Sequence, residues 1–130
     1  MPHARGEFTV KITPQAPGPG GTESGLGRMA LDKQYQGDLE ATAVGEMLTA
    51  MSPSVKNSGT YVAVERVTGT LNGRRGSFML WHSGTMTRGA QQLTITIVPD
   101  SGTDELTGIS GTLGITITDG KHYYDLEYTR

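Results

Sequence analysis

Glu65 and His82 are the two residues of this sequence best suited to acid–base chemistry. A carboxylate that holds an imidazole in place is a common arrangement for moving a proton. In an apolar cavity we expect the pKa of the glutamate to be raised, which is how enzymes prepare a carboxylic acid for proton transfer near neutral pH. The alternative is a structural role, either in a buried ion pair or with the glutamate hydrogen-bonded to the corners of a sheet.

Three polar residues near the C-terminus form a second candidate group. His122, Tyr124 and Tyr128 occupy alternate positions in HYYDLEY, so they share one face of a predicted strand. They could donate hydrogen bonds to a ligand carbonyl, or they could be core residues whose polar ends bond to the backbone. A metal site formed by Glu65, His82 and His122 is a further alternative. Their spacing does not require a metal, and we predict no metal and no other cofactor.

Two other ionisable residues are weaker candidates. Glu46, in the stretch AVGEML, is expected to point inward if its strand keeps the same alternation as its neighbours. His3 lies close to the N-terminus, where we expect a flexible segment, and we assign no role to it. Catalysis by a serine, a histidine and an aspartate is not supported, because no serine lies in the sharp turn that such a nucleophile needs.

The hairpin that carries Glu65 and His82 is predicted by Asn72-Gly73, a strong signal for a two-residue turn with positive φ angles. This register places Glu65 opposite Leu80 and diagonal to His82, at roughly 7–8 Å between backbones. The large apolar side chains nearest the turn mark this face as the inner one. It comprises Tyr61, Ala63, Glu65, Val67, Phe78, Leu80 and His82. The outer face comprises Val62, Val64, Arg66, Thr68, Ser77, Met79 and Trp81.

A second hairpin is predicted by Asp119-Gly120. Directly opposed residues share a face of the sheet, so Ile117 lies on the same side as His122, and Ile115 on the same side as Tyr124. The buried face of this hairpin is therefore apolar except for its histidine and its two tyrosines.

The rest of the chain also favours strands. EFTVKIT and QLTITIV alternate apolar and polar residues, which is the period of a half-buried strand. A helix competes only in GDLEATAVGEMLTAM, where Gly45 and the preceding strand pattern favour a strand. Seven or eight antiparallel strands with one apolar face and no layer of helices form either a sandwich or a closed barrel. A barrel of about eight strands has room for one small ligand.

The composition limits the class of protein. The chain has 130 residues, 19 glycines, no cysteine and a net charge of −2. These features fit a single all-β domain over 1–130, with a flexible loop rich in proline and glycine at 13–27. The charge gives no basic surface for nucleic acid and no reason to expect a membrane as partner. The absence of cysteine excludes thiol catalysis, and the absence of an apolar leader predicts a cytoplasmic location.

Three stretches together resemble a known family. YQGDLEATAVGEML, YVAVERVTGTLNGRRGSFMLWHSGTM and LTITIVPDSGTDELTGISGTLGITITDGKHYYDLEY are similar to the bacterial family called domain of unknown function 3224. The resemblance covers roughly residues 28 to 128, and GRRGSF, VPDSGTDELTGISGTL and HYYDLEY are its most specific parts. It implies a small closed β-barrel of the allene oxide cyclase-like kind and so favours a barrel over a sandwich. It implies no activity.

Three functions follow from these patterns. The first is a binding module for a small, mostly apolar molecule in the barrel interior, with His82 as polar anchor. The second is a cofactor-independent isomerase or cyclase in which Glu65 or His82 moves a proton. The third is a structural or interaction protein with a filled barrel, against which the ionisable residues on the inner face argue. The residues predicted to bind the ligand are Glu46, Tyr61, Phe78, Leu80, Ile95, Ile115, His122, Tyr124 and Tyr128.

The predicted outer face also suggests a partner. Trp81 and Met79 lie together on the outside of the first hairpin. Large apolar side chains that remain exposed next to one another often mark a contact with another molecule. We therefore expect a homo-oligomer, most simply a homodimer, formed through this face.

Overall fold

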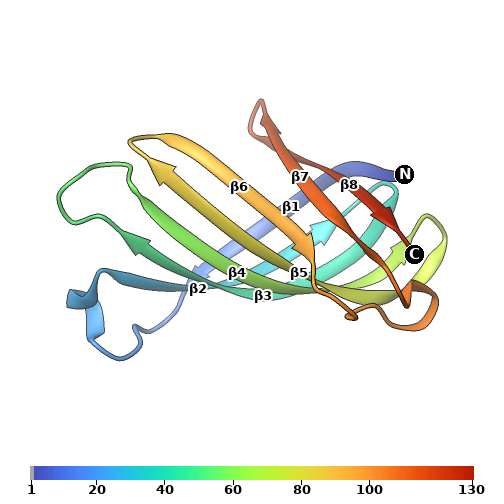
Figure 1. Ribbon diagram of the computed structural model, residues 1–130, viewed down its shortest axis with the longest axis horizontal. Helices are drawn as coiled ribbons and strands as arrows, with labels where there is room; N and C mark the ends of the chain where they lie inside the picture. The colour runs from blue at the N-terminus through green and yellow to red at the C-terminus, as the bar shows by residue number, and fades with distance from the viewer. Residues whose placement is uncertain (1) are drawn as a thin grey trace.

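Eight antiparallel strands follow one another around a closed barrel, and β1 pairs with β8 to complete it (Figure 1). The computed structural model describes residues 2–130, apart from the side chains of residues 22 and 23, so residue 1 of the predicted domain lies outside the described residues. The prediction of a small closed antiparallel barrel is confirmed. The elements are β1 (His3–Pro14), η1 (Gly21–Ser24), β2 (Leu26–Tyr35), β3 (Leu39–Met51), β4 (Gly59–Leu71), β5 (Arg74–Thr87), β6 (Ala90–Ile97), η2 (Asp104–Leu106), β7 (Ser110–Thr118) and β8 (Lys121–Thr129).

Helical structure is confined to the two short 3₁₀ turns η1 and η2 in the described part of the chain. No helix there is long and apolar enough to cross a bilayer. The turn η1 lies in the loop predicted at 13–27, and β1 and β2 both extend slightly into that loop.

Strand β3 is the segment for which a helix competes in the sequence, and the prediction of a strand is confirmed. It pairs along its whole length with β4 and over most of its length with β2. A helix here would leave the backbone groups of both neighbouring strands without partners. Pairing within the sheet therefore outweighs the helix propensity of the alanine, leucine and methionine residues in this segment.

Two tight turns set the register of the strands that carry the candidate residues. The φ angles are 46° and 84° at Asn72 and Gly73, and 52° and 77° at Asp119 and Gly120. Positive values at both central residues are those of the predicted hairpin turn. Both registers are confirmed, with Glu65 opposite Leu80, Ala63 opposite His82, Ile117 opposite His122 and Ile115 opposite Tyr124.

One end of the barrel is closed by the loop between β6 and β7. The backbone N–H of Thr103 donates to the carbonyl of Ser77, so this loop runs beside β5 where β6 has already ended. Leu106 and Ile109 from the loop are completely buried in the core. The loop also explains why Ser77 is buried although it lies on the predicted outer face.

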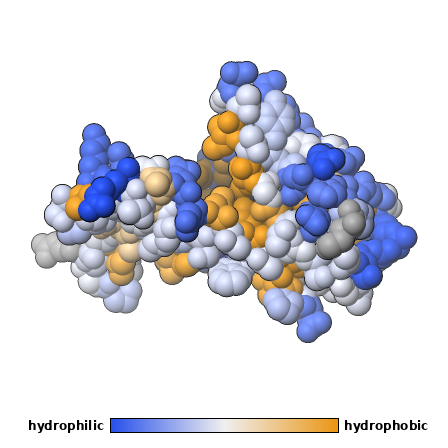
Figure 2. Space-filling view, turned by 45° about the horizontal axis from the view of Figure 1, so that its top comes forward, coloured by the Kyte–Doolittle hydropathy of each residue, from blue (hydrophilic) through white to orange (hydrophobic). Residues whose placement is uncertain are grey.

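The other end of the barrel is open. Within the described residues, the registered pairing between β6 and β7 consists of Thr96 with Thr112, and beyond this pair the two strands separate (Figure 1). Leu93 and Ile117 therefore remain exposed although they have the inward alternation. Figure 2 shows hydrophobic residues gathered in a hollow in the middle of the molecule. The barrel thus has one packed end and one apolar opening.

Candidate functional site

Four polar side chains from three strands meet inside the barrel. Oε2 of Glu65 accepts hydrogen bonds from Lys33 Nζ at 2.7 Å and from His82 Nε2 at 2.6 Å. The other carboxylate oxygen, Oε1, accepts a hydrogen bond from the hydroxyl of Tyr35. All four residues are buried. We refer to Lys33, Tyr35, Glu65 and His82 as the buried cluster.

Small residues on β3 allow the buried cluster to form. This strand lies between β2 and β4, and its inward positions beside the cluster are Ala43 and Gly45. A Cβ atom at position 45 would lie 2.8 Å from the Cβ of Glu65, which is closer than such atoms approach. The missing side chain leaves room for Lys33 to reach across β3 to the carboxylate. The hairpin register brings His82 to the same carboxylate from the other side, as predicted.

The surroundings of Glu65 keep it ionised. Burial raises the pKa of this carboxyl, but the hydrogen bond from His82, the charge and hydrogen bond of Lys33 and the hydrogen bond from Tyr35 together lower it to about 2. The expectation of a raised pKa is therefore wrong, because polar and charged donors surround the carboxylate. Near neutral pH, Glu65 holds the imidazole in place and does not itself exchange a proton.

Lys33 and Tyr35 are members of the buried cluster that the sequence analysis missed. Both lie on β2 at alternate positions with Leu31, which is also buried. The signal for Lys33 is its position in LDKQY, where it alternates with two large residues, Leu31 and Tyr35, that point inward. Its Nζ lies 5.2 Å from the ring centroid of Phe8, within range of a cation–π attraction. Burial and the negative charge of Glu65 raise the pKa of Tyr35, so its hydroxyl stays protonated and donates.

The two ring nitrogens of His82 have different surroundings. Because a carboxylate only accepts hydrogen bonds, Nε2 carries the proton that points to Glu65. Among the described residues Nδ1 has no hydrogen-bond partner, whereas every completely buried side-chain nitrogen or oxygen there has one. Nδ1 is therefore the ring nitrogen left for a further contact, although only 4% of the His82 side chain is exposed.

An apolar cavity of about 270 Å³ lies at the open end of the barrel. Tyr61 lines it, as the sequence predicts for a ligand-binding residue. The ring centroid of Tyr61 is 6.4 Å from that of His82, so the cavity adjoins the buried cluster through this tyrosine. Gly84 lies opposite Tyr61 and leaves space for its ring. The cavity is also lined by Met47, Thr49, Met51, Met86, Gln92 and Leu93. Of these, Leu93 follows the inward alternation of QLTITIV, and the sequence analysis singled out none of the others.

The apolar residues predicted to bind a ligand lie elsewhere. Phe78, Leu80 and Ile95 are completely buried in the packed core. Ile115 is partly buried and packs against them. None of these four residues lines the cavity.

The two tyrosines of β8 hold turns at the closed end. The hydroxyl of Tyr124 donates to the carbonyl of Gln36 at 2.8 Å and accepts from the N–H of Leu39 at 2.9 Å, which ties the turn between β2 and β3. The hydroxyl of Tyr128 accepts from Asn72 Nδ2 at 2.7 Å, at the turn between β4 and β5. Tyr124 is thus a core residue whose polar end bonds to the backbone, whereas the polar end of Tyr128 bonds to a side chain.

His122 and Glu46 do not join the buried cluster. His122 is partly exposed, and its ring centroid is 5.2 Å from that of Phe8. The expectation that Glu46 points inward is wrong, because it pairs with the outward residue Val64 and binds Arg28 on the surface at 2.8 Å. In the part of the chain that the structure describes, no three histidine, aspartate or glutamate side chains are placed to hold a metal ion.

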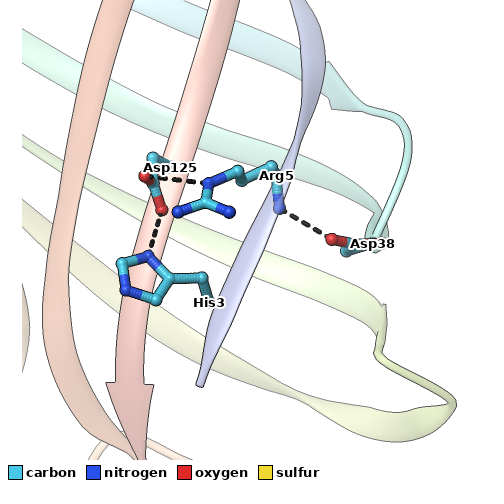
Figure 3. A network of polar contacts seen from close by, with 4 residues as sticks. All are labelled: His3, Arg5, Asp38 and Asp125. Carbon is cyan, nitrogen blue, oxygen red and sulfur yellow. Dashed lines mark hydrogen bonds and ion pairs between the residues drawn. The ribbon is translucent and has the colours of Figure 1, made fainter. Parts of the chain in front are cut away.

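A second carboxylate–histidine pair lies on the outside of the barrel. His3 Nδ1 is 2.7 Å from Asp125 Oδ1, and Arg5 Nε donates to Asp125 Oδ2 at 3.1 Å (Figure 3). The backbone N–H of Arg5 donates to Asp38 at 3.0 Å. The hydrogen bond from His3 is the main cause that lowers the pKa of Asp125. His3 lies in β1, which pairs with β8 at this point, so the expectation of a flexible segment at His3 is wrong.

The chain belongs to the family described as Protein of unknown function (DUF3224), whose model matches residues 4–128. It is 48% identical to a protein with unknown function from the DUF3224 family of Shewanella oneidensis MR-1, whose crystal structure has been solved. The two structures superpose with a TM-score of 0.91 over 99% of this chain and 97% of that chain. No functionally curated protein matches the chain. The relatives therefore support the fold and assign no activity.

Proposed function

We propose that this protein binds a small, mostly apolar molecule in the cavity at the open end of the barrel. One observation carries the proposal: the apolar cavity adjoins a cluster of buried ionisable side chains through Tyr61. Ligand sites in proteins commonly combine apolar walls with a few polar groups that orient the bound molecule. A barrel of this size can hold one such ligand.

The cavity walls indicate which molecules fit. Met47, Met51 and Met86 offer flexible and polarisable contacts, which suit an apolar body of irregular shape. Thr49 and Gln92 can bind a hydroxyl or carbonyl group. The volume of about 270 Å³ is close to the lower limit for small-molecule sites. The proposed ligand is therefore a compact molecule with one or two polar groups. His82 does not line the cavity but lies beside Tyr61, and it would be the polar anchor of a ligand that reaches past this ring.

Binding of the neutral dye N-phenyl-1-naphthylamine tests this proposal. We expect a saturable increase in fluorescence with one dye molecule for each chain. Leu93→Arg places a charge in the cavity wall and should weaken dye binding at least about tenfold. Leu26→Arg is the matched control, because Leu26 is an exposed leucine that does not line the cavity. The proposal fails if the parent does not bind the dye, or if Leu93→Arg binds it as tightly as the parent does.

The contact between Glu65 and His82 supports a second candidate, a cofactor-independent isomerase or cyclase. The carboxylate holds Nε2, so Nδ1 is the base that would take a proton from a carbon next to a carbonyl group. The imidazolium would then return this proton to another carbon of the same molecule. In this reaction His82 is the catalytic residue and Glu65 is a positioning residue.

Hydrogen exchange separates this candidate from simple binding. A small cyclic ketone in D₂O should exchange the hydrogens next to its carbonyl faster with the parent than in buffer, as measured by nuclear magnetic resonance. His82→Phe should lose this acceleration and still bind the dye. If the parent does not accelerate exchange, the enzymatic candidate is rejected and the binding proposal stands.

A further inference from the structure

The outer face of β3, β4 and β5 carries apolar side chains that the proposed ligand site does not use. Val64 lies in the middle of this face, directly opposite Trp81 on β5. Leu48 on β3 lies opposite Val62 on β4. All of these side chains are exposed. We define the outer patch as Val44, Leu48, Val62, Val64, Met79 and Trp81.

The size of the outer patch fits one protein interface. Its exposed fractions correspond to roughly 500–600 Å² of apolar surface, at the upper end for the largest patch of a soluble monomer. A stable dimer buries about 800 Å² on each partner, of which somewhat more than half is apolar. The patch can therefore supply the apolar part of such an interface. Charged side chains lie among these apolar residues, since Glu46 pairs with Val64 and Arg66 pairs with both Val44 and Met79. With Arg28, which pairs with Leu48, they would supply the polar contacts of the interface.

The outer patch also contains both halves of a self-complementary contact. A groove of about 530 Å³ is lined by Leu48, Val62, Val64 and Trp81, and also by the charged residues Arg28 and Glu46. The side chain of Trp81 is at the same time one of the largest exposed apolar groups, with 51% of the residue accessible. An interface with two-fold symmetry places the same surface of one copy against the other. The indole of each copy can then enter the groove of its partner.

We propose that the outer patch is the interface of a homodimer in which Trp81 of each copy packs into the groove of the other copy. Tryptophan contributes strongly to interfaces when it fills a pocket that excludes water. The patch shares no residue with the cavity lining. The dimer is therefore independent of the proposed ligand and can be tested separately from it.

Sedimentation equilibrium tests the interface. The parent should have twice the chain mass of 13.8 kDa. Val64→Lys places two like charges, one from each copy, in the middle of the interface and should give a monomer with an unchanged circular dichroism spectrum. Val55→Lys is the matched control, because Val55 is an exposed valine of the loop between β3 and β4, outside the patch. It should remain a dimer.

Trp81 provides a measurement that needs no variant, because it is the only tryptophan of the chain. Its fluorescence should shift to longer wavelength when dilution separates the dimer and exposes the indole. The proposal is overturned by a parent that is monomeric at its highest soluble concentration, or by a folded Val64→Lys variant that remains a dimer. An emission maximum of solvated tryptophan at every concentration would overturn it as well.

Discussion

Two carboxylate–histidine pairs in this molecule have nearly the same length and opposite surroundings. Glu65 and His82 are 2.6 Å apart inside the barrel, and their side chains are 1% and 4% exposed. Asp125 and His3 are 2.7 Å apart on the outside, and their side chains are 45% and 35% exposed. The distance between the atoms therefore does not tell the two pairs apart. Their access to water does.

Access to water decides what happens when one partner of a pair is lost. Water can solvate His3 or Asp125 if the other is removed, so the protein loses little. Inside the barrel no such replacement exists, and Lys33, Glu65 and His82 depend on one another. An isolated buried charge costs several kcal/mol. A buried cluster of this kind is therefore sensitive to the loss of any one member, and its imidazole is held in one position.

The largest effect is expected for Glu65→Gln. Glutamine keeps the shape of the side chain but leaves the ammonium group of Lys33 buried without a counter-charge. We expect the free energy of unfolding to fall by about 3–5 kcal/mol, as measured by urea denaturation.

A double variant provides the control for this prediction. Adding Lys33→Met to Glu65→Gln removes the unpaired charge, and methionine fits the space of the lysine stem. The double variant should recover most of the lost stability. If it is as unstable as Glu65→Gln alone, the loss reflects packing and not charge, and the contrast with the surface pair is wrong.

The second effect in size is the response to acid. The pKa of Glu65 is about 2 in the folded protein, against 4.5 for an ordinary glutamate. Because the folded pKa is the lower one, the ionised carboxylate stabilises the fold at pH values above about 4.5, and this contribution disappears as the pH falls toward about 2. The shift corresponds to about 3 kcal/mol. Unfolding free energies measured across this range should show the loss.

The double variant again separates the two pairs in this experiment. The double variant lacks the carboxylate of Glu65, so its free energy of unfolding should fall much less over the same range of pH. The remaining decrease should come from exposed carboxylates such as Asp125. Equal losses in the parent and the double variant would show that the buried carboxylate is not the main acid-sensitive group.

The sequence predicts the strands, both hairpin registers and the contact between Glu65 and His82. These features depend on local signals, namely alternation and the dipeptides Asn72-Gly73 and Asp119-Gly120. A two-residue turn fixes every pair along its hairpin. One reliable turn was therefore enough to place a glutamate on β4 beside a histidine on β5.

The rest of the buried cluster depends on contacts between distant strands. Lys33 reaches Glu65 only because β3 has Ala43 and Gly45 at the inward positions between them. The pKa of Glu65 could not be predicted without this lysine. The position of the cavity is equally nonlocal, because it follows from the separation of β6 and β7 at one end of the barrel. For this reason Phe78 was predicted to line a ligand site and lies instead in the packed core.

The smallest effect is expected for Asp125→Asn. This change removes the negative charge that binds His3 and Arg5, but water reaches all three side chains. We expect a loss of less than about 1 kcal/mol in the free energy of unfolding. About 1 M NaCl should abolish most of this loss, because salt screens exposed charges. The loss caused by Glu65→Gln should persist in the same salt, because buried charges are screened much less. If Asp125→Asn is as destabilising as Glu65→Gln, or if salt reduces both losses equally, burial is not what distinguishes the two pairs.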